Sequence, residues 1–187
     1  MDISKKNIRS EQIKEAAIEF SKGSTVAFSF LYAIFNRPIY RFCMRILNDE
    51  QTAKDAFQET FVRIYEHRAS FNGTNFEAWL YTTARNTCIN YIRKRKRTSS
   101  LGELDFGYVP TKYTKIGIRE HIEEMLDKLP LTLKEAVVLR DMQDLTYQDI
   151  ADVLGIDLSL AKVRVHRARL KLKELLAPLM REINEST

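Results

Sequence analysis

The sequence predicts an all-α protein in which two small helical domains are joined by a flexible linker. Apolar residues recur at three- and four-residue steps through most of the chain, as they do on the buried side of amphipathic helices. No stretch of any length shows the alternation of a half-buried strand. Residues 98–117 interrupt the helical pattern with serine, glycine, proline and threonine, so we expect this segment to be the linker.

The composition is that of a folded protein whose charge suits a polyanionic partner. Of the 187 residues, 44% are hydrophobic and 29% are charged, which excludes a largely disordered chain. The 30 Lys and Arg against 25 Asp and Glu give a formal net charge of +5. Cys43 and Cys88 lie on apolar helical patterns without metal-ligand spacing, so we expect buried free thiols in a reducing cytoplasm. No apolar run approaches the ~20 residues of a membrane span, so we expect no membrane insertion.

The first domain should be a helix bundle over residues 24–97, preceded by a helical extension over residues 1–23. Its helices are expected at residues 24–47, at 53–65 behind a break and N-cap at 48–49, and at 76–97. Pro38 lies within the first of these helices. Trp79 could stack on an unpaired base, but aromatic residues at helical spacing usually belong to the core, and we assign it there.

The third helix ends in five consecutive basic residues, 93–97. A flexible basic tail would account for this run alone. Arg85, Asn86 and Asn90, however, step along one side of the helix toward it, which favours a continuous DNA-facing surface.

The second domain, residues 118–187, contains the signals of a helix-turn-helix. Thr146 is a suitable N-cap, and Gly155 supplies a left-handed turn residue. The small Ala151 would let the following helix cross closely, while five further apolar side chains fill the shared core: Ile150, Leu154, Ile156, Ala161 and Val165. Two helices that cross at a steep angle are therefore expected.

The helix that begins near Ser159 is strongly basic and has no acidic residue before Glu174. A solvated surface helix would account for this charge, but the preceding turn favours DNA binding with early residues toward bases and later ones toward phosphates. His166 has no metal-ligand neighbours, so a groove or phosphate contact is expected of it. Leu160 and Val163 are candidates for contacts to thymine methyl groups.

Two groups of motifs, in order, resemble the extracytoplasmic-function (ECF) sigma factors of bacterial RNA polymerase. Those that resemble region two of the family are Asp55–Phe61, Phe76–Leu80, Ala84–Asn86 and the basic run. Those that resemble region four are Leu129-Pro130, Val138–Arg140, Leu145–Ala151, Leu154–Ile156 and His166–Arg169. The resemblance covers about residues 24–97 and 118–176. It implies a non-enzymatic subunit, without metal or cofactor, that binds core polymerase and directs promoter recognition, opening and initiation.

The resemblance also implies where each partner binds. The clamp helices of the polymerase beta-prime subunit would contact Asp55, Gln58, Glu59, Phe61 and Arg63, with Phe61 exposed beside the polar pair, although a core position for Phe61 stays open. The minus-ten element would contact Asn72, Gly73, Thr74 and Asn75, which would capture a flipped base, and Arg85, Asn86, Asn90, Arg93 and Arg97. The minus-thirty-five element would contact Thr146, Tyr147, Gln148, Ser159, Leu160, Lys162, Val163, Arg164, His166, Arg167 and Arg169. The polymerase beta flap and an anti-sigma factor are further candidate partners.

Lys54 stands where the family commonly has an acidic residue, and residues 159–161 replace its usual Gly-Thr-Val, so promoter preference does not transfer. A stand-alone helix-turn-helix regulator that binds operators as a dimer is the main alternative, and the motif at residues 55–61 speaks against it. An enzyme is disfavoured, because the sequence has no phosphate-binding glycine loop, metal cluster or paired nucleophile and base.

Overall fold

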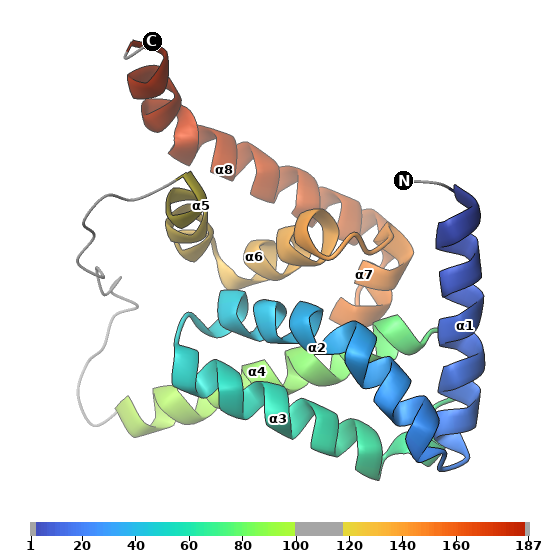
Figure 1. Cartoon of the computed structure of the whole chain (residues 1–187). Coiled ribbons are helices and arrows are strands. Elements are labelled where there is room, and N and C mark those ends of the chain that lie inside the picture. Colours follow the sequence, from blue (N-terminus) through green and yellow to red (C-terminus); the bar gives the residue numbers. More distant parts are fainter. Residues whose placement is uncertain (1–2, 100–117, 186–187) are drawn as a thin grey trace. The chain divides into compact units, whose positions relative to one another are not determined.

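The computed structural model describes residues 3–99 and 118–185, and every regular element within these ranges is a helix (Figure 1). The all-α prediction is therefore confirmed for the described part of the chain. The chain divides into two compact units, residues 1–91 and 92–187. Residues 100–117 of the expected linker lie outside the described residues. Its first two residues, 98–99, belong to the last helix of the bundle, which continues to Ser99.

The first unit is a bundle of long helices. They are α1 (Ile3–Ser21), α2 (Thr25–Leu47), α3 (Glu50–Glu66), the short 3-10 helix η1 (Arg68–Ser70) and α4 (Phe76–Ser99), whose last residues continue past the unit boundary at residue 91. The breaks follow local signals: Ser24 accepts a hydrogen bond from the Ala27 amide at the start of α2, and Asp49 accepts one from the Thr52 amide at the start of α3. Between these helices, Asn48 adopts the left-handed conformation that ends α2.

Aromatic and aliphatic side chains fill the core of this bundle. The largest fully buried ones are Phe20 of α1, three residues of α2 (Leu31, Ile39, Phe42), Ile64 of α3, and Leu80 and Tyr81 of α4. Cys43 and Cys88 are buried free thiols, as expected. The core assignment of Trp79 holds only in part: its ring packs on Phe71 and Phe76, with centroids 5.4 and 5.9 Å away, but the residue is half-buried and not fully buried. The buried side of α4 runs instead through Leu80, Ala84 and Cys88, one turn apart.

The second unit contains the remaining helices. They are α5 (Ile118–Asp127), α6 (Leu131–Val137), the π-helical turn η2 (Val138–Met142), α7 (Tyr147–Leu154) and α8 (Leu158–Glu185). α8 packs against α5, α6 and α7 and forms one wall of the core. Pro130 separates α5 from α6, and across it the buried ammonium of Lys134 pairs with Asp127, whose carboxylate oxygen lies 2.5 Å away. This pair ties the two short helices together.

Candidate nucleic-acid interface

The helix-turn-helix predicted in the second unit is formed by α7 and α8. The Thr146 hydroxyl accepts a hydrogen bond from the Asp149 amide, and the Asp149 carboxylate accepts one from the Thr146 amide, which completes a capping box. Gly155 ends α7 in the left-handed conformation, with φ of 64°. The predicted shared core is confirmed except at Ile156, which is only half-buried because it lies in the turn after Gly155. The buried members are Ile150, Ala151, Leu154, Ala161 and Val165.

α8 begins with a cap that the sequence reasoning missed. The Asp157 carboxylate accepts hydrogen bonds from the Leu160 amide at 2.7 Å and from the Ser159 hydroxyl at 2.5 Å. These bonds stabilise the ionised form, and the pKa of the Asp157 carboxyl lies below its ordinary value. Asp two residues before an exposed Ser at the start of a basic helix is the sequence signal that could have located it.

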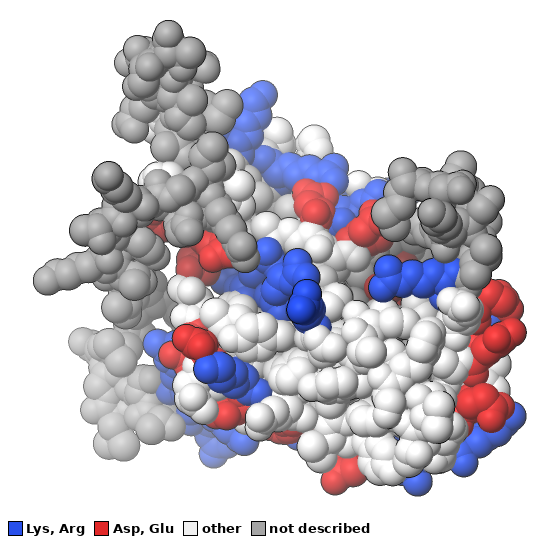
Figure 2. Space-filling view, viewed as in Figure 1, with Lys and Arg blue, Asp and Glu red and all other residues white. Residues whose placement is uncertain are grey.

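The outward side of α8 presents both cationic and apolar side chains. Ala161, Val165 and Ala168 are buried, whereas Lys162, Val163, His166 and Arg167 are exposed. Because successive helical residues are about 100° apart, Val163 and Leu170 point almost directly away from the buried side. Lysines and arginines gather over α8 in the space-filling view (Figure 2). This is the surface at which the sequence predicts base contacts.

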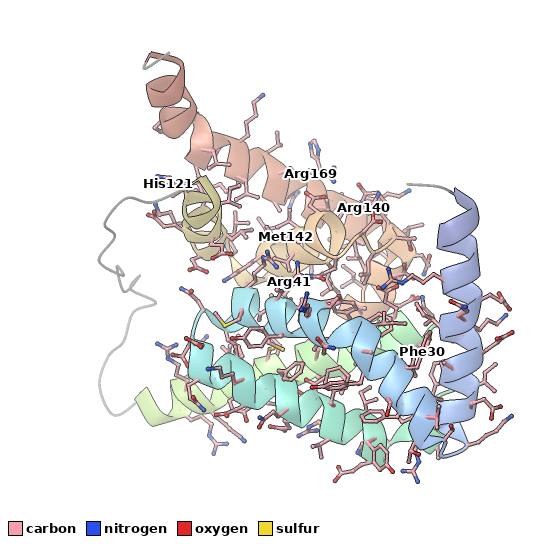
Figure 3. The ribbon with its side chains drawn as sticks, in the orientation of Figure 1. Phe30, Arg41, His121, Arg140, Met142 and Arg169 are labelled. Atoms are coloured by element: carbon pink, nitrogen blue, oxygen red, sulfur yellow. The ribbon has the colours of Figure 1, made fainter. Side chains whose placement is uncertain are left out.

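Several of the predicted contact residues have partners within the protein. Arg169 forms two hydrogen bonds with Asp141 of η2, from Nε at 2.9 Å and from Nη2 at 2.5 Å. Tyr147 is half-buried beneath the guanidinium of Arg140, which lies 4.7 Å from the ring centroid. Figure 3 shows Arg140 and Arg169 on neighbouring elements of the second unit. Gln148 donates a hydrogen bond to Asp152 at 3.0 Å and remains exposed.

The helix α4 carries a polar row that leads into the basic run. Asn86, Asn90, Arg93 and Arg97 recur at steps of four, three and four residues, which keeps them within about 60° of one another around the helix. Arg85 lies about 100° from Asn86 and is half-buried, so it is beside this row and not on it. Asn86, Arg93 and Arg97 are exposed.

The turn at residues 72–75 joins η1 to α4 and presents polar groups beside Trp79. The Asn72 carboxamide oxygen accepts hydrogen bonds from the Thr74 amide and hydroxyl, at 3.1 and 2.7 Å. Asn75 Oδ1 accepts one from the Ala78 amide at 3.0 Å and so begins α4. Gly73 has a φ of 81°, which a residue with a side chain rarely adopts. The turn is therefore held in one shape by its own side chains.

The predicted polymerase-binding face on α3 is only partly exposed. Gln58 and Arg63 are exposed and Asp55 and Glu59 are half-buried, but Phe61 is buried, with 7% of its surface accessible. Its expected exposure was wrong because Phe61 lies on the side of α3 that packs against α2. The exposed apolar residue is its neighbour Val62, 54% accessible, which follows Gln58 by four residues and Glu59 by three. That spacing could have identified Val62 from the sequence.

Glu59 links α3 to α4. Its carboxylate accepts hydrogen bonds from Arg63 Nε and Nη2, at 2.8 and 2.6 Å. The Glu59 carboxylate is also hydrogen-bonded to the phenol of Tyr91. Burial of the phenol, together with this hydrogen bond, raises the pKa of Tyr91. The position of Glu59 is thus fixed from both sides.

No helix in the described ranges has the length and apolar character needed to cross a bilayer. Among the same residues, no group of three or more His, Cys, Asp or Glu side chains is arranged to hold a metal ion.

Two family models match the chain in the order of its two units. Sigma-70 region 2 matches residues 31–98, and Sigma-70 region 4 matches residues 119–172. The ECF RNA polymerase sigma factor SigM of Bacillus subtilis is 30% identical over 150 residues, which cover 78% of this chain and 92% of SigM. The chain belongs to the ECF sigma factors. SigW of Bacillus subtilis is also 30% identical, over 89% of this chain and 98% of its own.

Solved structures agree with this assignment. The sigma factor RpoE of Bartonella quintana, in complex with the anti-sigma factor NepR, matches with a TM-score of 0.68 and 27% identity, over 80% of this chain and 96% of its own. CnrH, in complex with the cytosolic domain of CnrY, matches in fold with a TM-score of 0.70 and 22% identity, over 89% of this chain and 98% of its own. This ECF sigma factor is a DNA-binding subunit that binds core RNA polymerase for promoter-directed initiation, and the operator-binding regulator is not favoured.

Proposed function

We propose that residues 24–97 form region two, which binds core polymerase and the minus-ten element, and that residues 118–187 form region four, which binds the minus-thirty-five element. The segment 1–23 extends region two, and the segment 98–117 is the linker. The arrangement of two helical units, with a helix-turn-helix in the second, supports this division.

The polymerase-binding face of region two is the outward row of α3. It comprises Asp55, Gln58 and Glu59 with Arg63 at its side, and the exposed Val62 supplies the apolar contact that Phe61 was expected to give. Protein-protein interfaces commonly have an apolar centre and a polar rim, and Val62 with its polar neighbours has this arrangement. Phe61 acts from within by supporting α3. The partners of this row are the beta-prime clamp helices, while region four contacts the beta flap.

The minus-ten element is bound by α4 and by the turn before it. Asn86, Asn90, Arg93 and Arg97 follow one strand, and Arg85 lies beside them. The turn Asn72–Asn75 receives an extruded base, because its fixed polar edges and the half-exposed Trp79 offer hydrogen bonds and a stacking surface. Because the turn already has a fixed shape, it loses little conformational entropy when it binds the base, and this favours affinity.

The minus-thirty-five element is bound by the outward side of α8 and the first turn of α7. Ser159, Lys162 and Val163 lie in the first two turns of α8 and face bases, together with Leu160. Arg164, His166 and Arg167 continue toward the phosphates. Thr146, Tyr147 and Gln148 approach the backbone from the N-terminus of α7.

The site of action is the cytoplasm, where core polymerase and promoter DNA are found. We also propose an anti-sigma factor as a regulatory partner, since RpoE, which shares 27% identity with this chain, is named in complex with the anti-sigma factor NepR. Such a partner would compete with polymerase.

The observation that carries the proposal is the outward side of α8, which joins exposed cations to exposed apolar residues on the second helix of a helix-turn-helix. The test is multiple-round transcription by core polymerase with the full-length chain, from a library of promoters that differ in the minus-thirty-five and minus-ten elements. Initiation from a defined subset of promoters is expected. Initiation that is insensitive to changes in either element would contradict the division of labour.

A further inference from the structure

One ion pair joins segments of the second unit that are far apart in sequence. Asp141 in η2 and Arg169 in α8 are 28 residues apart, and both oxygens of the carboxylate accept hydrogen bonds from the guanidinium. Such two-point contacts fix the relative orientation of the two groups, not only their distance. The Arg169 side chain is 50% exposed and that of Asp141 is 36% exposed, so water screens the pair and it adds little to stability.

Arg169 is distinguished among the cations of α8 by its partner, the Asp141 carboxylate. It lies about 120° around the helix from Val163, the centre of the outward side, and about 20° from Lys162 two turns earlier. Arg167, two residues earlier, is exposed and lies nearer that side, only about 40° from Val163. The two hydrogen bonds to Asp141 direct the Arg169 guanidinium toward η2.

The same junction contains the first residue of α7. Arg140, the neighbour of Asp141, donates a hydrogen bond to the Leu145 carbonyl at 2.6 Å and stacks on the Tyr147 ring. Tyr147 also interacts electrostatically with Arg169. Asp141, Arg169, Arg140 and Tyr147, which we call the clasp, thus connect η2, α7 and α8 at one point.

We propose that the clasp sets the orientation of the recognition helix, and that Arg169 is a positioning residue that acts through Asp141 and does not neutralise a DNA phosphate. The proposal rests on the assignment of α8 to the minus-thirty-five element. α8 extends beyond the clasp in both directions, so a small rotation there displaces Lys162, about two turns away, relative to the bases. We therefore expect the clasp to have a larger effect on the preference among minus-thirty-five sequences than on the free energy of unfolding of the second unit.

The experiment uses holoenzyme reconstituted from core polymerase and full-length chain, with binding measured on matched and mismatched minus-thirty-five elements over a range of salt concentrations. The variants are Asp141→Asn, Arg169→Gln, the exchanged pair Asp141→Arg with Arg169→Asp, and Asp141→Glu. The control is Arg167→Gln, an exposed arginine of the same helix that is proposed to contact DNA. Melting temperatures are recorded for every variant.

Asp141→Asn and Arg169→Gln should lower discrimination between the two elements to a similar extent, by about fivefold or more, with the slope of binding against salt unchanged. Asp141→Glu, which keeps the carboxylate, should retain most of the discrimination. The exchanged pair should discriminate between the two elements better than either Asp141→Asn or Arg169→Gln. Arg167→Gln should instead reduce the salt slope by about 0.9.

Three results would overturn the proposal. A salt slope reduced by Arg169→Gln as by Arg167→Gln would make Arg169 a phosphate contact. Unchanged discrimination in both Asp141→Asn and Arg169→Gln would contradict the positioning role. A loss of discrimination that is fully explained by lowered melting temperatures would also contradict it. Wild-type holoenzyme that does not distinguish the two elements would instead refute the assignment of α8, which separates failure of the proposed function from failure of the clasp.

Discussion

The rings of Tyr32 on α2 and Phe61 on α3 meet edge to face, with centroids 4.8 Å apart. This contact, together with that of Phe57 and Phe61 at 5.2 Å, holds Phe61 inside the bundle. Because adjacent residues on a helix diverge by about 100°, the same geometry turns Val62 outward. The residue that we propose to contact polymerase is therefore the smaller Val62, while the aromatic Phe61 supports α3 from the core.

We predict that Val62→Asp weakens binding of core polymerase by about tenfold, because a buried charge would replace the apolar centre of the α3 row. Gln58→Ala should weaken it to a smaller extent. The matched control is Val26→Asp on α2, where 79% of the residue is already exposed. Titration of labelled core polymerase gives the dissociation constants, and equal effects at positions 62 and 26 would argue against the α3 row.

We predict that Phe61→Ala acts mainly on stability. Loss of a buried aromatic side chain costs about 3–5 kcal/mol, in contrast to substitutions at exposed positions. Denaturant unfolding, followed by the fluorescence of the single tryptophan of the chain, reports on the first unit. A variant with normal unfolding and lost polymerase binding would instead place Phe61 in the interface.

Local features of this fold could be predicted from the sequence, whereas contacts between distant segments could not. The caps at Ser24, Asp49 and Thr146 depend on residues three positions away, so they are visible in a linear pattern. The choice between Phe61 and Val62 depends on which side of α3 meets α2, which periodicity leaves uncertain by one residue. Nothing in the sequence indicates that Arg169 pairs with Asp141, because both residue types are ordinary on exposed helices.

Within region four, we predict different effects for two lysines of α8. Lys162→Ala should change the ranking of minus-thirty-five sequences, with about 1–3 kcal/mol lost at its preferred base, because Lys162 lies near the start of α8, the part proposed to face bases. Lys171→Ala should weaken all sequences nearly equally and reduce the salt slope by about one. A promoter library transcribed by both variants distinguishes these effects. An unchanged ranking with Lys162→Ala would mean that the helix docks differently.

The capping box of α7 gives a prediction about stability. Thr146→Ala removes both the hydroxyl that accepts from the Asp149 amide and the bond from that hydroxyl to the Asp149 carboxylate. The free energy of unfolding of the second unit should fall by about 1 kcal/mol. Thr146→Ser, which keeps the hydroxyl, is the control. Hydrogen exchange of the α7 amides measures the change, and equal protection in all three proteins would contradict it.

Asp157 gives a prediction about pH. Its folded-state pKa lies below the ordinary value of 3.8, so its carboxylate stabilises the folded protein above that value and loses this effect as pH falls through the folded pKa. Asp157→Asn keeps a capping oxygen but not the charge. Wild type should therefore melt at a higher temperature than Asp157→Asn at pH 7, and the difference should vanish in acid. A difference that persists below pH ~2 would exclude a charge effect.

The half-exposed Trp79 also makes the protein its own optical reporter. It is the only tryptophan in the chain, and it lies against Phe71 and Phe76 at the turn proposed to receive an unpaired base. A nucleobase stacked on an indole quenches its emission, so mixing the isolated chain with a short single strand in a stopped-flow instrument would follow base capture in real time. Neither partner would need a dye, and a kinetic record of promoter capture would come directly from the native sequence.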